Sequence, residues 1–369
     1  MIKGEIKGLC ILFCILLIHP LSYGQLGGNN VFKFVNIPNS ARITGLGGQV
    51  LSVLDNDIAL TMSNPAALNK KMDGGLSFQQ NYYFSDSKGG FFAYGQYIKA
   101  WDVTIMGGMQ FMNYGQFDLT DVFGNTQGEF SAAEWNFTLG AGKALNENYH
   151  VGANLRYVAS FLESYRSAGL LGNISMMYIN ENKGLVGTLL FKNIGGQLTT
   201  YNGLRESVNF EILASLSKRL NHLPFRYSII YHHLNRWNIL YDDPDNVENP
   251  FFNVESSQKS ALSQYVDNFF RHFIINGEFL IGPKENFNLR IGYNHFRRKE
   301  LVLENTFSLA GFSFGFGMKV YRFKLDYGYA VQHRGANIHH LGISTYLSEF
   351  KRKKSEIIRT GNIGELITH

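Results

Sequence analysis

The stretch that decides the fold is Tyr149–Phe161, which reads YHVGANLRYVASF. Its odd-numbered positions are apolar or aromatic, and its even-numbered positions are mostly small or polar. Successive side chains of a β-strand point to opposite faces of the sheet, so this alternation predicts a strand with one apolar and one polar face. The pattern recurs in 135–141 (WNFTLGA) and in 321–329 (YRFKLDYGY). We therefore expect a sheet with an apolar side and a polar side.

About fourteen such segments follow one another between residues 75 and 350. Several are longer than the roughly 5 or 6 residues of soluble strands and reach the roughly 9 to 11 residues of a tilted membrane strand. Bacterial outer-membrane barrels have an even number of antiparallel strands. The sequence therefore predicts an all-β fold, a transmembrane antiparallel β-barrel of about fourteen strands over 75–350. The expected strands are roughly 75–84, 89–99, 101–115, 130–144, 148–164, 167–180, 183–193, 206–219, 223–235, 268–282, 286–297, 305–319, 321–332 and 336–349.

The connections between these segments alternate in length. Every second one is very short, whereas the long ones, 115–129, 195–205 and 235–267, all fall in the other set. Outer-membrane barrels combine short periplasmic turns with longer extracellular loops. We therefore expect the long loops at the cell surface and both termini in the periplasm. The apolar positions change parity around Gly311, which predicts a bulge or kink in the wall.

The composition agrees with a barrel and excludes other classes. The 369 residues include 39 Gly, 30 Phe and 20 Tyr, but only 17% are charged. Disordered chains are poor in aromatic residues and rich in net charge, so this chain is not one of them. A net charge of +5 spread along the chain does not indicate a nucleic-acid partner. Outside the N-terminus, no stretch approaches the roughly 18 apolar residues of a membrane-spanning helix.

Both ends of the chain carry their own signals. Residues 1–24 have a basic start, an apolar centre and a small residue at Gly24, which predicts a secretory signal peptide. Both cysteines, Cys10 and Cys14, lie within it, so the exported chain is expected to lack disulfides and cysteine chemistry. Residues 351–369 begin with KRKK and form a basic tail, expected in the periplasm. There it either contacts anionic lipid headgroups or is simply solvated.

Residues 25–74 do not follow the strand pattern, and we interpret them as an N-terminal plug or periplasmic segment. They contain Ser40-Ala41-Arg42, the glycine-rich turn 45–48 (GLGG), the acidic step 55–57 (DND) and Asn64-Pro65-Ala66-Ala67-Leu68. With these motifs the chain resembles the PorQ family of outer-membrane proteins in the type IX secretion system of Bacteroidetes. That family is related to PorV and, more distantly, to the long-chain fatty-acid transporter (FadL) family of plugged fourteen-stranded barrels.

The resemblance implies an outer-membrane anchor of the surface attachment complex. Such an anchor is expected to hold a PorZ-like surface protein and to work with a PorU-like sortase and a PorV-like shuttle, which together link secreted cargo to surface lipopolysaccharide. The alternative is a FadL-like transporter of small hydrophobic molecules, suggested by the related family and by the parity change at Gly311. No spacing selects a catalytic triad or a cofactor motif, so we expect neither an enzyme nor a bound cofactor.

Four groups of residues are candidates for binding. The pairs His232-His233 and His339-His340 look like metal ligands, but adjacent strand residues face opposite sides, so we interpret them as strand tips and expect no metal. The acidic stretch 242–248, with Asp242 and Asp243, is interpreted as a solvated extracellular loop, with calcium or partner contact as the other reading. The aromatic residues after it either contact a partner or pack over the barrel mouth. The predicted partner-binding residues are Asp242, Asp243, Phe251, Phe252 and Tyr265.

The polar face of the strands carries charges of both signs. They are Glu134, Arg156, Glu211, Arg290, Lys324 and Asp326. A mixture of signs favours internal salt bridges in a filled lumen over an ion-selective pore, which tends to carry rings of one charge.

Overall fold

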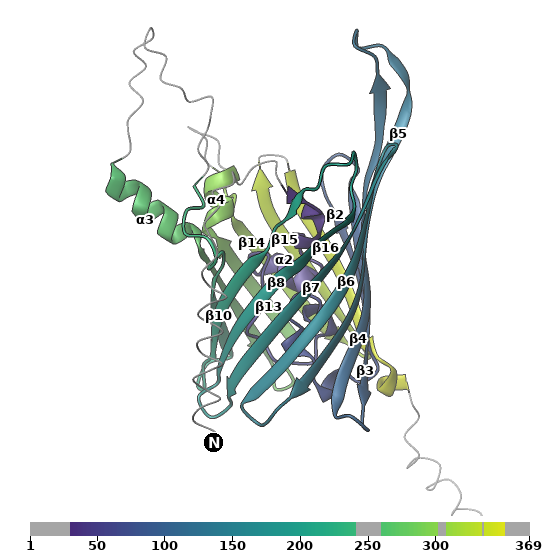
Figure 1. Cartoon of the computed structure of the whole chain (residues 1–369). Coiled ribbons are helices and arrows are strands. Elements are labelled where there is room, and N and C mark those ends of the chain that lie inside the picture. The colour runs from purple at the N-terminus through teal and green to yellow at the C-terminus, as the bar shows by residue number, and fades with distance from the viewer. Residues whose placement is uncertain (1–29, 241–259, 302–307, 334–335, 351–369) are drawn as a thin grey trace, which may run out of the picture.

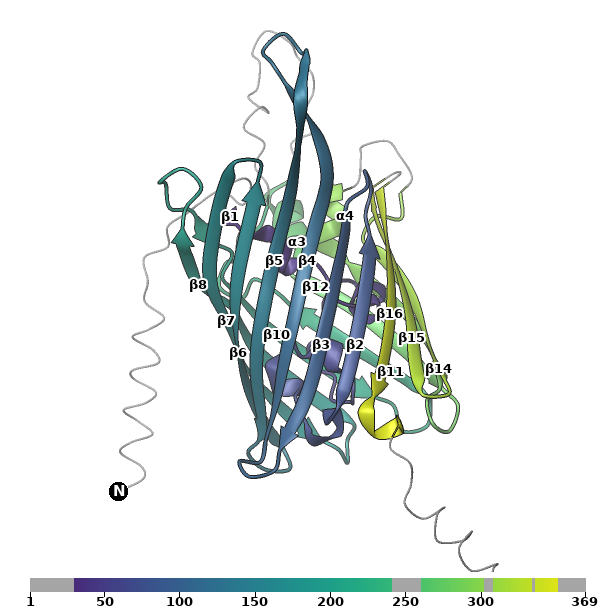
Figure 2. The same cartoon turned by 90° about the vertical axis from the view of Figure 1, so that its right-hand side faces the viewer.

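The structure is a computed structural model that describes residues 30–240, 260–301, 308–333 and 336–350. The predicted signal peptide and the basic tail lie outside these residues. Within them, fourteen strands close into an antiparallel barrel, in the order β10 to β16 followed by β2 to β8, so that β16 pairs with β2 and β8 with β10 (Figures 1 and 2). The strands are β2 (Gly75–Tyr82), β3 (Lys88–Ile98), β4 (Val103–Thr120), β5 (Thr126–Ala144), β6 (Tyr149–Leu162), β7 (Tyr165–Asn180), β8 (Leu185–Thr199), β10 (Glu211–Arg219), β11 (Phe225–Tyr231), β12 (Phe273–Ile281), β13 (Phe287–Asn294), β14 (Phe312–Val320), β15 (Phe323–His333) and β16 (Ala336–Tyr346).

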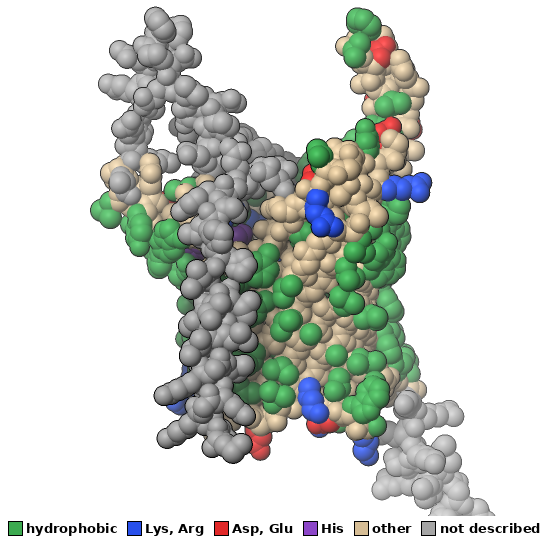
Figure 3. All heavy atoms as spheres, in the orientation of Figure 1, with side chains coloured by type: hydrophobic (Ala, Val, Ile, Leu, Met, Phe, Trp, Pro, Cys, Tyr) green, Lys and Arg blue, Asp and Glu red, His purple; other side chains and the backbone are tan. Residues whose placement is uncertain are grey.

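The two faces of the wall follow the predicted alternation. Leu139, Leu155 and Ile174 point outward and are 71%, 53% and 54% exposed, whereas their neighbours Thr138, Asn154 and Asn173 are buried on the inside. Figure 3 shows apolar side chains spread over the visible wall and charged ones near its two ends. This is the surface of an outer-membrane barrel, with an apolar band between two polar rims. No helix among the described residues is long and apolar enough to cross a membrane.

The two ends of the barrel differ. At one end, here called the short-turn end, the connections are tight; the other, the long-loop end, carries the β4–β5 hairpin and the helices α3 (Ala261–Arg271) and α4 (His295–Leu301) (Figure 1). The expected loop 115–129 is mostly strand, because β4 and β5 continue far beyond their neighbours (Figure 2). Phe117 stacks on Phe130 across the hairpin at 5.3 Å, and Asp121 accepts hydrogen bonds from the backbone of the turn. Cross-strand aromatic pairs of this kind stabilise a hairpin.

Strand limits near the helices were predicted incorrectly. Residues 268–271 belong to α3 rather than to a strand, and residues 295–297 belong to α4. The apolar residues of α3 are spaced three and four apart, which suits a helix, and Ser260 caps it by accepting a hydrogen bond from the backbone of Ser263 at 3.2 Å. Strand β10 begins at Glu211 rather than near 206, because Ser207–Val208 form a separate short strand, β9, parallel to β1 (Asn30–Val31).

The parity change predicted around Gly311 falls at the start of β14, which begins at Phe312. Gly311 has a φ of 85°, and its backbone still bonds to both neighbouring strands: it donates to the carbonyl of Val331 at 3.2 Å and accepts from the N–H of Asn294 at 2.9 Å. The wall is therefore irregular at this glycine. Irregular registers occur elsewhere in the wall, between Asn113 and Gln116, between Gly172 and Ile174, and between Val331 and His333. Each marks a place where one strand carries residues that its partner does not match.

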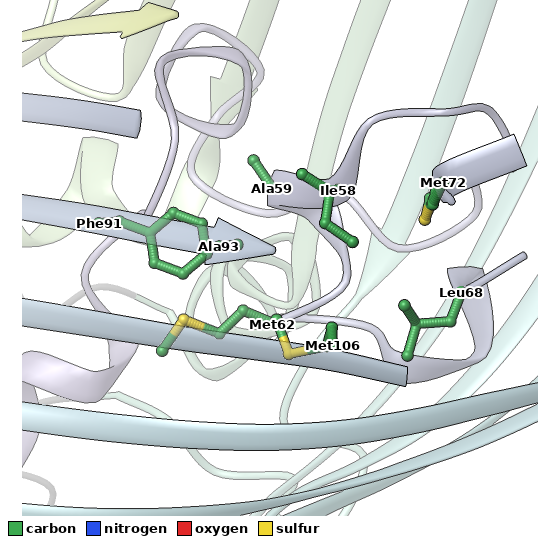
Figure 4. Packing of buried hydrophobic residues seen from close by; sticks show 8 residues of the cluster. All are labelled: Ile58, Ala59, Met62, Leu68, Met72, Phe91, Ala93 and Met106. Atoms are coloured by element: carbon green, nitrogen blue, oxygen red, sulfur yellow. The ribbon is translucent and has the colours of Figure 1, made fainter. Parts of the chain in front are cut away.

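Residues 30–74, here called the inner segment, run inside the barrel (purple in Figure 1). They form short elements rather than strands, and their apolar side chains pack against the inner face of the wall. In Figure 4, Ile58, Met62 and Leu68 of this segment lie with Phe91 of β3 and Met106 of β4, and all of them are buried. The elements are η1 (Lys33–Asn36), α2 (Ala41–Gly45), η2 (Ile58–Leu60), η3 (Pro65–Ala67) and η4 (Lys70–Met72).

Candidate functional site

The most extensive polar cluster joins the inner segment to the wall through Arg42. This residue lies in α2, whose N-cap Ser40 accepts a hydrogen bond from the backbone of Ile43. Its guanidinium contacts Asp55 at 2.8 Å and Asp57 at 3.1 Å within the segment, and Glu278 of β12 at 2.9 Å. Arg42 is 3% exposed. A buried guanidinium requires such partners, because an unpaired charge inside a protein is very costly.

The wall completes the cluster. Glu278 also contacts Arg226 and lies 3.0 Å from Arg290 Nε, and Arg290 contacts Asp326 at 2.6 Å. Lys324 lies 3.4 Å from Asp57. Charges from five elements therefore balance: the cations are Arg42, Arg226, Arg290 and Lys324, and the anions are Asp55, Asp57, Glu278 and Asp326. We call these eight residues the charge cluster.

The carboxylates of the inner segment stay ionised. Burial alone would raise the pKa of Asp57, but Lys324 and Arg42 outweigh it and hold that pKa below its usual value. The pKa of Asp55 is lowered in the same way, where Arg42 and Arg226 overcome the effect of burial. The pKa of Arg42 is raised because its three acidic partners outweigh its burial. At neutral pH the three inner-segment members of the cluster, Arg42, Asp55 and Asp57, are thus charged.

On the opposite side, β5 to β7 hold the inner segment by close backbone approach. A Cβ at Gly142 would come 2.6 Å from the carbonyl oxygen of Pro65, and a Cβ at Gly152 would collide with the same carbonyl. Next to them Ser175 accepts a hydrogen bond from the backbone of Ala66 at 2.9 Å, and Asn154 donates one to the carbonyl of Met62 at 2.9 Å. Glycine is required here because any side chain would push the segment away from the wall.

The register shift at Asn173 lies between an inner cavity and an outer hollow. The inner cavity has a volume of about 10 Å³, which suits one water molecule, and Asn173 and Arg156 line it. The outer hollow has about 490 Å³ and an apolar lining that includes Ala153, Ile174 and Phe191. Asn173 itself is fully buried and accepts a hydrogen bond from the backbone of Asn193, which has a φ of 59°.

The histidine pairs behave differently from each other. His339 and His340 lie within β16, and they face outward and inward as expected. The expectation is wrong for His232 and His233, whose Nδ1 atoms face each other at 2.5 Å, because the pair follows the end of β11 and His233 has a φ of 57°. The pKa of both imidazoles is lowered, mainly by burial, and that of His232 lies well below its usual value.

Of the predicted partner-binding residues, only Tyr265 falls in the part of the chain that the structure describes. It is 58% exposed on α3, and its ring lies 5.4 Å from that of Trp237. Asp242, Asp243, Phe251 and Phe252 lie outside the described residues. Figure 1 shows α3 extending outward from the long-loop end instead of lying over the mouth. Its exposed apolar side chains are those of Leu262, Tyr265, Val266, Phe269 and Phe270.

Sequence reasoning anticipated part of the charge cluster. It placed Arg290, Lys324 and Asp326 on the inner face but did not single out Glu278, which contacts three arginines. The available signal was a carboxylate at an inward position of β12, a strand whose alternate residues Ile275, Phe279 and Ile281 are apolar and exposed. The partners of Arg42 were not predictable from spacing, since Glu278 is 236 residues away.

Comparison with known proteins gives distant structural likenesses. No protein-family description and no curated protein matches the sequence. Among solved structures, the CymD monoaromatic hydrocarbon channel is 13% identical, with 85% of this chain and 97% of that chain covered and a TM-score of 0.48. The Pseudomonas putida toluene transporter TodX is 14% identical (84% and 96% covered, TM-score 0.49), and a Pseudomonas aeruginosa FadL homologue is 11% identical (84% and 98% covered, TM-score 0.47).

Proposed function

We propose that this chain is an outer-membrane docking protein, a barrel plugged by its inner segment that holds a protein partner at the cell surface. The observation that carries the proposal is the way the inner segment is fixed: a largely buried, balanced cluster of eight charges on one side and close backbone contacts on the other. A segment held to the wall by these contacts is better suited to fill the lumen permanently than to move as a gate. The mechanism is anchoring, and no covalent bond is made or broken.

The long-loop end supplies the surface on which a partner would dock. The β4–β5 hairpin projects beyond the rest of the barrel, and α3 presents exposed aromatic side chains such as Tyr265 and Phe270 (Figure 1). Exposed apolar clusters outside the membrane band mark protein interaction sites. On the resemblance of the N-terminal motifs to the PorQ family, we propose a PorZ-like surface protein as the partner, with PorU-like and PorV-like components in the same attachment complex.

The proposal requires the long-loop end to face outward. A cysteine placed at Asn125, in the turn of the β4–β5 hairpin, should react with a membrane-impermeant thiol reagent added to intact cells. A cysteine at Lys284, in the short turn between β12 and β13, should react only after the outer membrane is opened. The reverse pattern would invert the orientation and remove the docking surface from the cell exterior.

Docking itself is tested by crosslinking and purification from native membranes. We expect the full chain to be recovered with a surface protein, and crosslinks to map to the β4–β5 hairpin or α3. A variant with residues 116–129 replaced by a two-residue turn should keep the barrel but lose the partner. Recovery of the barrel alone, together with correct attachment of secreted proteins in a deletion strain, would contradict the proposal.

A second candidate is a channel for small hydrophobic molecules, and one observation favours it. The register shift at Asn173 separates the inner cavity from the apolar outer hollow, so a local opening there would connect the lumen with the membrane. This function predicts a lipid-like molecule in the purified barrel, detected by mass spectrometry, and a growth defect of the deletion strain on hydrophobic substrates. Neither result is expected for a docking protein.

A further inference from the structure

We propose that Glu211, His232 and His233 form a binding site for a divalent transition-metal ion, with Zn²⁺ as the best-suited probe. One carboxylate oxygen and two imidazole nitrogens form this group, and the three ligand atoms all lie within 4.8 Å of one another. Two imidazoles and a carboxylate are a common protein ligand set for zinc, with a fourth position left for water. The site lies at the long-loop end and is independent of the charge cluster.

The backbone of this region brings the ligands together. Glu211 is the first residue of β10, and the two histidines directly follow β11, its neighbour in the barrel. The positive φ of 57° at His233 turns its side chain to the same side as that of His232. Such a conformation is unfavourable for a residue other than glycine, and strain of this kind is found preferentially at functional sites.

The distances fit an ion after a small adjustment. Ligand atoms about 2.0–2.1 Å from a tetrahedral zinc ion are roughly 3.4 Å apart. Glu211 Oε1 lies 3.3 Å from His233 Nδ1 and 3.8 Å from His232 Nδ1. The two Nδ1 atoms are 2.5 Å apart, shorter than the roughly 2.7–3.2 Å of ordinary hydrogen bonds from N–H groups, and rotation of the rings would widen this gap.

The surroundings favour an ion on these three atoms. The other carboxylate oxygen of Glu211 faces Lys192 Nζ at 3.9 Å, which leaves Oε1 to the histidines. His272 is not a fourth ligand, because its ring nitrogens contact the carbonyl oxygens of His232 (2.7 Å) and Trp237 (2.9 Å). The first of these contacts fixes the backbone of His232, and the ring of Phe296 packs against both histidines. The two imidazoles are thus held in place by packing, and their side chains are only 6% and 13% exposed.

The bound ion would brace the start of β10 against the end of β11 and the chain leading to Trp237. Trp237 in turn packs on Tyr265 and Phe269 of α3. An ion at this site would therefore stabilise the base from which α3 projects.

The test uses the full, untagged exported chain, stripped with a chelator and titrated with ZnCl₂ in detergent. We expect one Zn²⁺ per chain by elemental analysis, and a Tm that rises with ion concentration, because an ion that binds the folded state stabilises it. His233→Ala and Glu211→Gln should weaken binding at least about tenfold. His222→Ala, at an exposed histidine of the short-turn end, is the matched control and should bind as the parent does.

Three results would overturn the site: no stoichiometric Zn²⁺ on the parent chain, equal binding by the parent and both ligand variants, or loss of binding in the His222→Ala control alone. If His233→Ala fails to fold, Glu211→Gln and the visible spectrum of the Co²⁺-loaded parent decide. A spectrum with tetrahedral, nitrogen-ligated cobalt bands supports the site, and a purely octahedral, oxygen-ligated spectrum contradicts it.

Discussion

The inner segment meets two kinds of wall. Strands β11, β12, β13 and β15 combine close glycine contacts, as at Gly328, with charges, of which Glu278 is the main partner of Arg42. Strands β5, β6 and β7 hold it with glycines and single hydrogen bonds, as at Gly152 and Ser175. On the side with the charge cluster, here called the charged side, each buried ion depends on particular counter-ions, so individual residues of the inner segment and the wall are specific for one another. The side formed by β5 to β7, here called the glycine side, makes no ion pair of the charge cluster and holds the segment by shape and by a few hydrogen bonds to its backbone.

The two sides should therefore respond differently to single substitutions. Removal of one ion leaves its partners buried without compensation, a cost that the surrounding structure cannot relax. An added methyl group at a glycine displaces the segment by a distance that neighbouring loops can partly absorb. We therefore expect the charged side to be the more sensitive of the two.

The largest effect is expected for Arg42→Met. The substitution leaves Asp55, Asp57 and Glu278 with fewer cations and should lower the free energy of unfolding by about 3–5 kcal/mol. The measurement is urea unfolding of the folded barrel in detergent, followed by tryptophan fluorescence. Lys319→Met is the matched control, because Lys319 pairs with Glu349 on the surface, where an ion pair contributes only about 0–1 kcal/mol.

A double variant sharpens this prediction. Glu278→Gln added to Arg42→Met removes one charge of each sign, so the double variant should lose less stability than the sum of the two single variants, with a coupling of about 0.5–3 kcal/mol. Strict additivity would mean that Arg42 and Glu278 act independently, and the charge cluster would then not be a unit.

A smaller effect is expected on the glycine side, for Gly152→Ala. The new Cβ would collide with the carbonyl of Pro65, and overpacking of this kind costs about 1–3 kcal/mol. The same unfolding experiment measures it, together with limited proteolysis, which should cut the inner segment faster than in the parent chain. Gly196→Ala is the control, since no atom lies within 4 Å of the Cβ position there. A Gly152→Ala loss larger than that of Arg42→Met would reverse the comparison.

The strands of the barrel wall were predicted better than the contacts of the residues inside the barrel. Period-two alternation was sufficient to predict about fourteen strands, and it gave the correct outward face for Tyr149–Phe161. It failed at α3, whose apolar residues were assigned to a loop and a strand. Local periodicity is a property of neighbouring residues, so it is read easily from a sequence.

The contacts inside the barrel join residues that are distant in sequence. Arg42 and Glu278 meet only because the barrel closes around the inner segment, and no spacing rule connects them. The group of Glu211, His232 and His233 was missed for a different reason. The alternation rule was applied beyond the end of β11, where the positive φ of His233 breaks it.

The smallest effect is expected for Ser175→Ala, which removes one hydrogen bond on the glycine side. The backbone N–H of Ala66 donates to Ser175 Oγ at 2.9 Å, but it also lies 3.1 Å from Asn64 Oδ1. The donor therefore keeps a partner after the substitution, and the loss should be about 0.5–1 kcal/mol in the same unfolding experiment. Ser77→Ala, which removes a hydroxyl from the inner face of β2 without touching the backbone of the inner segment, is a suitable control. A loss near 3 kcal/mol for Ser175→Ala would show that single polar contacts fix the segment as strongly as the charge cluster does, and the two sides of the wall would then be equivalent.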